Sequence, residues 1–188
     1  MTLDKLSIIW SSRVNWEREK DDFYPTPPHA VYPLIQMEEF EWSILEPACG
    51  EWDISECFIN KWYEVISTDL VSRWYWVWDI DFLLYNWEMV DNIVTNPPFR
   101  LAKDFIRVSK KYAKKRIAML LKTTFLEWVW RYEMFQDKDF PLKTVYQFCR
   151  RVTFSKRWEW VKSGWLIAYA WFVRDKDHIW PPNIKWIK

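Results

Sequence analysis

The chain has 188 residues, half of them apolar, which is enough to form the core of one globular domain. Its formal net charge of +1 excludes binding to nucleic acid through overall charge alone, so any such binding requires a local basic patch. The three scattered cysteines and two isolated histidines give no paired metal-ligand spacing, and no apolar run is as long as a membrane span. We expect a reduced, cytoplasmic protein with neither a metal nor a membrane partner.

One feature of the composition is abnormal. The chain has 17 tryptophans and 2 glycines, whereas average usage predicts roughly 13 glycines. Several tryptophans fall in turn-like or charged segments where glycine is expected, namely Trp74, Trp76, Trp78, Trp128, Trp130, Trp158 and Trp160. Our hypothesis is that most tryptophans are glycine codons, which follows if the source reads UGA as glycine and the translation table reads it as tryptophan. The alternative is a tryptophan-rich protein with an unusual core or many stacking surfaces.

The first part of the chain divides into an arm and the start of a domain. Residues 1–22 are polar and charged without a sustained period, which predicts a flexible N-terminal arm before a single domain over residues 23–188. The prolines of residues 22–28 predict an extended segment. Apolar residues at helical spacing then predict a helix that ends near Phe40, with Thr26 as its N-cap.

Residues 43–54 combine a short apolar strand, a turn of small residues and the start of a helix that runs to about Asn60. Such a turn lets backbone N–H groups approach a ligand at the helix N-terminus. An indole at position 52 would fill the space that the ligand needs, so this interpretation requires glycine in place of Trp52.

Acidic residues follow the next apolar segments. Residues 63–69 predict a strand that ends at Asp69, and an acid at this place commonly binds ribose hydroxyls, although an aspartate that caps a turn is also common. Asp79 and Asp81 lie beside Phe82, an arrangement suited to holding the amino group of an adenine next to an aromatic ring.

Residues 93–99 predict a buried strand that ends at Asn96, two prolines and Phe99. An amide beside a backbone carbonyl can accept two hydrogen bonds from one planar amino group, and the ring can stack on the plane that bears it. This indicates an exocyclic amine of a base as the substrate. The alternative is a strand followed by an Asn-Pro turn.

The remaining chain continues the alternation of helices and strands. The pattern predicts a helix after Phe99, a buried strand at residues 117–121, a helix at 125–135, strands at 144–148 and 165–173, and an irregular tail from Asp175. Residues 150–157 are strongly basic around one aromatic ring, which suits phosphate contacts with base stacking, and a plain charged loop is the alternative; the candidate residues are Arg150, Arg151, Phe154, Lys156 and Arg157. Alternating elements with right-handed crossovers predict an α/β, doubly wound, mostly parallel sheet with ligands at the carboxyl ends of its strands.

With these motifs, the chain resembles the small, single-domain N6-adenine DNA methyltransferases of phages and prophages, from about Trp10 to Trp186. The segment 22–28 is similar to the N-terminal cofactor segment of that family, 45–54 to its methionine-binding loop, Asp69 to its ribose acid, and Asn96–Phe99 to its catalytic tetrapeptide. Relatives commonly have glycine at the positions of Trp10, Trp52, Trp128 and Trp165, whereas Trp171 and Trp186 resemble genuine tryptophans.

The resemblance implies a Rossmann-like, seven-stranded class I methyltransferase sheet with its last strand antiparallel, S-adenosylmethionine as the cofactor, and duplex DNA with a flipped adenine as the partner. Asn96, Pro97, Pro98 and Phe99 are its catalytic residues. The cofactor-binding residues are Tyr24, Thr26, Pro27, Glu46, Pro47, Ala48, Cys49, Gly50, Trp52, Asp69, Leu70, Asp81, Phe82 and Asn96. Methylation of RNA or of a glutamine amide, and a catalytically silent nucleic-acid-binding module, are the alternatives.

Overall fold

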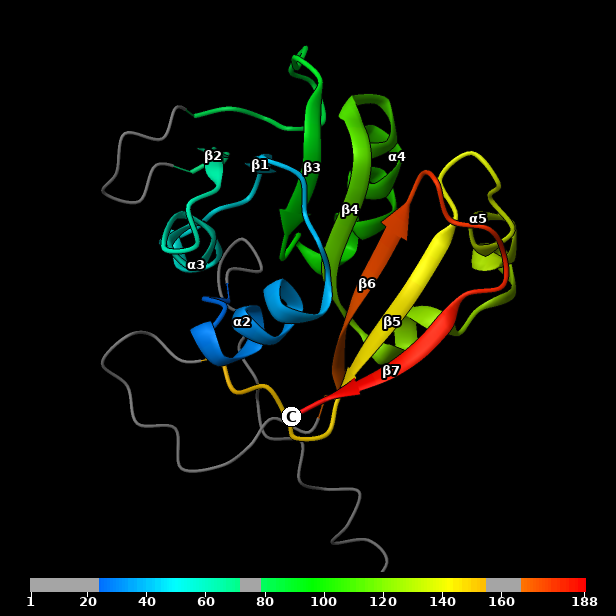
Figure 1. Ribbon diagram of the computed structural model, residues 1–188. Helices are drawn as coiled ribbons and strands as arrows, with labels where there is room; N and C mark the ends of the chain where they lie inside the picture. The colour runs from blue at the N-terminus through cyan, green and yellow to red at the C-terminus, as the bar shows by residue number, and fades with distance from the viewer. Residues whose placement is uncertain (1–23, 72–78, 155–166) are drawn as a thin grey trace, which may run out of the picture.

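The computed structural model describes residues 24–71, 79–154 and 167–188. Its centre is a seven-stranded sheet in the order β2-β1-β3-β4-β6-β5-β7 (Figure 1). The strands are β1 (Ser43–Glu46), β2 (Glu64–Ser67), β3 (Val90–Thr95), β4 (Ala113–Lys122), β5 (Leu142–Phe148), β6 (Tyr169–Asp175) and β7 (Asn183–Ile187). The α-helices are α2 (Pro28–Met37), α3 (Asp53–Ile59), α4 (Ala102–Tyr112) and α5 (Tyr132–Phe135), and short 3-10 helices span Phe99–Leu101, Thr123–Leu126 and Val129–Arg131.

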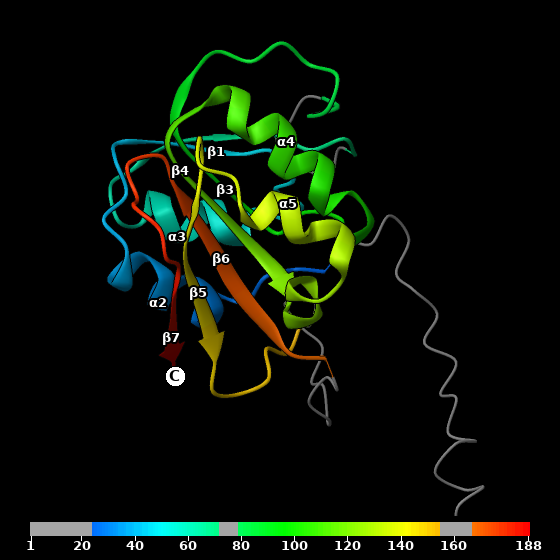
Figure 2. The same cartoon turned by 90° about the vertical axis from the view of Figure 1, so that its right-hand side faces the viewer.

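The helices cover both faces of the sheet, with α2 and α3 on one side and α4 and α5 on the other (Figure 2). The strands β1 to β4 are parallel, and β6 runs antiparallel between β4 and β5. This confirms the predicted doubly wound, mostly parallel α/β sheet. The carboxyl ends of β1 to β4 and the first residue of β6 consequently lie at one edge of the sheet.

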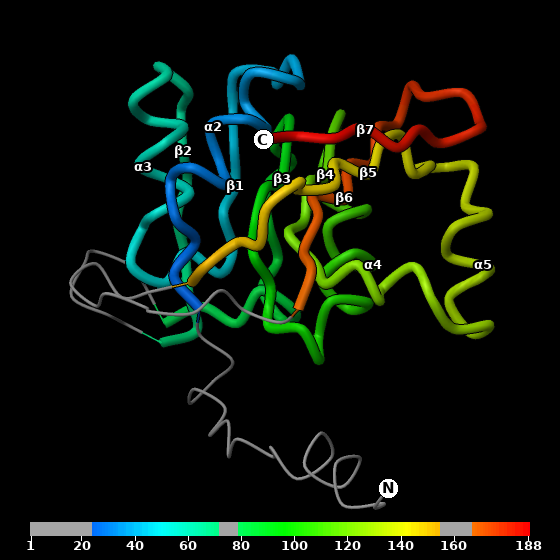
Figure 3. The backbone as a smooth tube through the Cα atoms, turned by 90° about the horizontal axis from the view of Figure 1, so that it is seen from below, coloured from blue at the N-terminus to red at the C-terminus, as the bar shows by residue number. Residues whose placement is uncertain are grey.

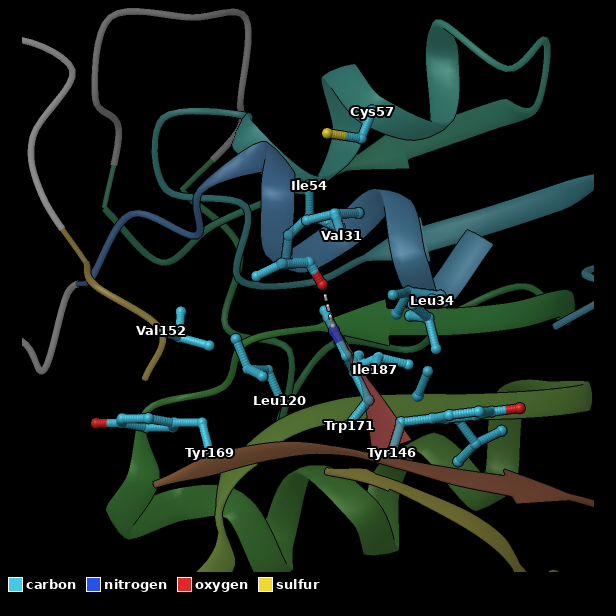
Figure 4. Packing of buried hydrophobic residues seen from close by; sticks show 14 of the residues in the cluster. Val31, Leu34, Ile54, Cys57, Leu120, Tyr146, Val152, Tyr169, Trp171 and Ile187 are labelled. Carbon is cyan, nitrogen blue, oxygen red and sulfur yellow. Dashed lines mark hydrogen bonds between the residues drawn. The ribbon is translucent and has the colours of Figure 1, made fainter. Parts of the chain in front are cut away.

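The core under α2 is centred on Trp171 of β6, whose side chain is 0% exposed. Its indole N–H donates a hydrogen bond of 2.7 Å to the backbone oxygen of Ala30 in α2 (Figure 4). Val31, Leu34 and Tyr146 lie around this contact. A buried indole satisfies its single donor in this way, so Trp171 ties the helix to the sheet.

Two predictions about the end of the chain are wrong. The tail after Asp175 is not irregular throughout, because residues 183–187 form β7, which pairs in parallel with β5. The antiparallel strand is therefore the sixth in the chain, β6, and not the last. The sequence of β7 alternates polar and apolar residues from Asn183 to Trp186, but Pro181 and Pro182 directly before it favour an irregular tail, and four of its five residues are exposed.

The predicted helix over residues 125–135 is also wrong in detail. Two 3-10 helices and the short α5 occupy this region. Trp128 separates the two 3-10 helices with a backbone φ of 86° and ψ of 120°, values that no helix can accommodate.

Candidate cofactor and acceptor site

A cavity opens at the carboxyl edge of the sheet, where the segments after β1, β2 and β3 meet residues 24–26 and 80–83. Twelve of the 14 residues predicted to bind a cofactor line it, and Pro27 and Trp52 do not. The lining predicted residues are Tyr24, Thr26, Glu46, Pro47, Ala48, Cys49, Gly50, Asp69, Leu70, Asp81, Phe82 and Asn96. Residues predicted from separate stretches of the sequence thus meet at one site.

The charge of the cavity is one-sided. Four carboxylates line it, from Glu46, Asp53, Asp69 and Asp81, and none of the lining residues within the described ranges is basic. Opposite charges attract strongly at a partly buried site, so the cavity suits a ligand that carries positive charge. The pyrophosphate of a dinucleotide would be repelled here, which separates this site from the nucleotide sites of other doubly wound sheets.

Glu46, at the end of β1, is the most buried of these carboxyl groups, with 1% of its surface exposed. Burial raises its pKa well above the ordinary value, and the neighbouring Asp53 and Asp69 raise it further. The Ser55 hydroxyl donates a hydrogen bond to Glu46, which acts in the opposite direction. A positive charge in the cavity would favour the ionised form of Glu46 and so oppose this rise of its pKa.

Asp69 connects the loop after β1 to the end of β2. One carboxylate oxygen accepts a hydrogen bond of 2.8 Å from the backbone N–H of Gly50, and the other accepts one of 2.9 Å from that of Val71. Gly50 has a φ of 55°, a conformation that glycine adopts without steric cost. Asp69 thus shapes the loop at the same time as its carboxylate lines the cavity.

Asn96 lies directly after β3 and is held in one orientation. Its amide N–H₂ group donates hydrogen bonds of 3.1 Å to the backbone oxygen of Tyr24 and to the Thr26 hydroxyl. Its Oδ1 atom is buried and has no hydrogen-bond partner among the described residues. A buried acceptor without a partner is costly, so Oδ1 is an available acceptor for a ligand.

The same contact corrects the role predicted for Thr26. The N-cap of α2 is Pro27, and no side chain caps the helix. Pro28 takes the first helical position and needs no cap for its missing N–H, so the Thr26 hydroxyl is free to orient Asn96.

Four aromatic rings gather beside Asn96, and we call them the aromatic cluster: Tyr24, Phe99, Phe154 and Tyr169. Phe99 lies 5.9 Å from Tyr24 and 5.5 Å from Tyr169, measured between ring centroids, and Phe154 lies 4.8 Å from Tyr169. The Lys122 ammonium is 4.6 Å from the centroid of the Phe99 ring. Figure 3 shows the segment after β5, which carries Phe154, running back towards the segment before α2.

The residues predicted to bind nucleic acid have different surroundings. Arg150 and Arg151 are exposed, whereas Phe154 is 4% exposed and packs within the aromatic cluster instead of presenting a ring for base stacking. Lys156 and Arg157 lie outside the described residues.

The tetrapeptide predicted to be catalytic divides between two surfaces. Asn96 and Pro98 line the cavity, Pro97 is buried, and Phe99 lies outside the cavity on the side of Lys122. The tetrapeptide thus forms the boundary between the cavity and the aromatic cluster.

Sequence reasoning missed Lys122 and Tyr169. Lys122 is the last residue of β4, and Tyr169 is the first residue of the antiparallel β6. Lys122 lies at the carboxyl edge because it ends a parallel strand. Tyr169 lies there because an antiparallel strand begins where its parallel neighbours end. The direction of β6 is the signal that would have identified Tyr169.

The reason given for glycine at position 52 also needs correction. The Trp52 indole does not line the cavity, so it does not take the place of a ligand there. What favours glycine is the backbone, because Trp52 has a φ of 71° and a ψ of 11°, in the left-handed region.

No group of three or more metal-binding side chains occurs within the described ranges. None of the helices in that part of the chain is long and apolar enough to cross a membrane.

No known protein family and no curated protein matches this sequence. Solved structures share its fold. An assigned RNA methyltransferase from Pyrococcus horikoshii has a TM-score of 0.62 at 14% identity, with 93% of this chain and 99% of that chain covered. A Burkholderia thailandensis 1,6-didemethyltoxoflavin-N1-methyltransferase with bound S-adenosylhomocysteine has a TM-score of 0.56 at 12% identity, covering 92% and 85%. A dimethyladenosine transferase from Plasmodium falciparum has a TM-score of 0.56 at 17% identity, covering 81% and 63%. The fold is thus that of the class I methyltransferases.

Proposed function

We propose that this protein transfers a methyl group from S-adenosylmethionine to the N6 amino group of adenine in DNA. The observation that carries the proposal is the buried Asn96 Oδ1, an acceptor without a partner within the described ranges, at the boundary between the acidic cavity and the aromatic cluster. It is an acceptor for an amino group, placed between a site for a cation and a set of aromatic rings.

The acidic cavity supports S-adenosylmethionine as the cofactor. Its sulfonium and ammonium groups are positive, and the four lining carboxylates complement them. Phe82 and Leu83 provide apolar contacts for an adenine ring beside Asp81. Methyltransferases of the same fold, one of them crystallised with S-adenosylhomocysteine, support the same cofactor.

The acceptor side follows from the geometry of Asn96. Its Oδ1 and the Pro97 carbonyl accept the two hydrogens of the substrate amino group, which directs the nitrogen lone pair to the methyl donor. Phe99 stacks on the base. As the N–CH₃ bond forms and the S–CH₃ bond breaks, the nitrogen becomes positive, and the two oxygen acceptors stabilise this charge until a proton leaves for solvent. The reaction needs no strong general base.

DNA is proposed as the substrate because the Asn-Pro-Pro-Phe motif and its order after the cofactor loop resemble those of the DNA adenine enzymes. A duplex adenine must leave the stack, at a cost of a few kcal/mol. The exposed Arg150 and Arg151 are candidates for holding the DNA backbone. Their replacement by Gln should weaken DNA binding and flatten its salt dependence, and unchanged binding would refute this assignment.

The decisive experiment is transfer of labelled methyl groups to unmethylated duplex DNA, RNA and protein in parallel, using protein with glycine at position 52. Label on adenine N6 of DNA, absent with Asn96→Ala, is the expected result. Label only on RNA or on glutamine amides would overturn the choice of substrate but retain methyl transfer. Cofactor binding without transfer to any of the three would identify a silent module.

A further inference from the structure

Positive backbone φ angles fall on an unusual set of residues. Within the described ranges they occur at Gly50, Trp52, Trp62 and Trp128, with values of 55°, 71°, 68° and 86°. The three that are not glycine are all tryptophan, although only nine of the 17 tryptophans lie in these ranges. Asparagine and aspartate, which tolerate this conformation best, occupy none of these positions. A Cβ atom is disfavoured at positive φ, so tryptophan stands where the backbone requires glycine.

Trp62 occupies the position after a helix that glycine takes most often. The backbone N–H of Tyr63 donates to the oxygen of Phe58 at 3.2 Å, and that of Trp62 donates to the oxygen of Ile59 at 2.9 Å. These two bonds form a Schellman motif, which places its left-handed residue at Trp62. The apolar contact that accompanies the motif is also present, between the rings of Phe58 and Tyr63 at 5.4 Å. The Trp62 side chain is 84% exposed, so packing does not account for it.

Trp128 and Trp52 stand at two other turns. Trp128 combines its φ of 86° with a ψ of 120°, outside even the left-handed helical region and accessible to glycine alone without strain. Trp52 closes the turn of the loop after β1. Its backbone N–H donates a hydrogen bond of 2.8 Å to the oxygen of Cys49, and its backbone oxygen accepts one of 2.8 Å from the N–H of Glu56. Each backbone is fixed by hydrogen bonds on either side or by a 3-10 helix that follows.

Trp171 is the opposite case. It lies in the middle of a strand, is 0% exposed, and satisfies its indole N–H on Ala30 (Figure 4). The core surrounds the whole side chain, and the indole N–H is hydrogen-bonded. The tryptophans therefore divide into a position that requires the indole and positions that exclude it.

We infer that residues 52, 62 and 128 are glycine in the protein as its source makes it, because the source decodes UGA as glycine, and that Trp171 is a genuine tryptophan encoded by UGG. The loop after β1 then contains two glycines at positive φ, at positions 50 and 52, beside the cavity. The inference is independent of the proposed function, since neither the codons nor the backbone angles involve cofactor or substrate.

The codons give the first test. We expect UGA at positions 52, 62 and 128 and UGG at position 171, and peptides of the native protein with glycine at the first three positions and tryptophan at the fourth. UGG codons or tryptophan-containing native peptides at positions 52, 62 and 128 would overturn the inference.

A stability measurement gives the second test. The difference in Tm between the glycine and alanine variants should have opposite signs at position 62 and at a control position. Trp62→Gly should melt roughly 2–8 °C above Trp62→Ala, because only glycine relieves the clash of Cβ at positive φ. Trp42 is the matched control, since its side chain is also exposed, at 64%, and its φ is not positive. There Trp42→Ala should melt roughly 1–4 °C above Trp42→Gly, the ordinary order for these two residues. The ordinary order at position 62 would refute the inference, whatever the activity of the protein.

Discussion

Replacement of Glu46 by glutamine tests the electrostatics of the cavity. In the folded protein, burial raises the pKa of Glu46 well above its ordinary value of 4.5. At a pH between the ordinary pKa and the raised pKa, the folded state holds a proton that the unfolded state has lost. The contribution of Glu46 to stability is therefore complete below pH 4.5 and decreases as the pH rises towards the folded pKa. Glutamine keeps the shape and a hydrogen-bond partner for Ser55 without an ionisation.

The magnitude follows from linkage. Since Glu46 is almost completely buried, screening by solvent does not reduce the effect. Each pH unit within the window removes about 1.4 kcal/mol from the stability of the unmodified protein and nothing from Glu46→Gln. For a chain of this length, that corresponds to a difference in Tm of about 3–5 °C per pH unit.

Thermal melts of both proteins at half-unit intervals from pH 4 to pH 8 measure this difference. We expect the Tm of Glu46→Gln to increase relative to the Tm of the unmodified protein as the pH increases above 4.5. A Tm difference that is constant over the whole range would refute a raised pKa for Glu46. Within the pH window between 4.5 and the folded pKa of Glu46, binding of S-adenosylmethionine should in addition release protons from the unmodified protein but not from the variant, as calorimetry in buffers of different ionisation enthalpy detects.

Three further substitutions test the two sides of the site and the fold that supports them. Asn96→Ala should lower the rate of methyl transfer at least about 100-fold, through a lost hydrogen bond to a developing charge and lost orientation, while equilibrium dialysis shows cofactor affinity within a few-fold of the original. Lys122→Met, which removes the ammonium above the Phe99 ring, should weaken acceptor binding roughly fivefold in titrations and leave cofactor binding unchanged. Arg174→Ala should lower the Tm by at least about 6 °C, because this buried guanidinium donates to two backbone carbonyls at 2.8 Å that would lose their partner; an unchanged Tm would contradict this.

The cofactor half of the site could be predicted from the sequence because its residues follow apolar strands directly. Glu46, Asp69 and Asn96 each come at the end of such a strand, and the parallel sheet brings strand ends together. Local patterning and one topological rule were sufficient for these residues.

The placement of the later members of the aromatic cluster, Phe154 and Tyr169, required the structure. Tyr169 reaches the site only because β6 runs antiparallel, and strand direction is not encoded in the pattern of residues 165–173. Phe154 reaches it because the segment after β5 returns to Tyr24, a long-range contact without a local signal. β7 is an edge strand whose short polar–apolar alternation was outweighed by the two prolines before it, so its pairing with β5 was found only in the structure.

Among the described residues, those that line the acidic cavity all lie between positions 24 and 105, whereas Lys122, Phe154 and Tyr169 come from later in the chain. The lining of the cavity thus comes from one continuous part of the chain, whereas the aromatic cluster combines Tyr24 and Phe99 from that part with Phe154 and Tyr169 from later in the chain. A substitution after residue 105 can therefore alter the aromatic cluster without changing the lining of the cavity in the described part of the chain.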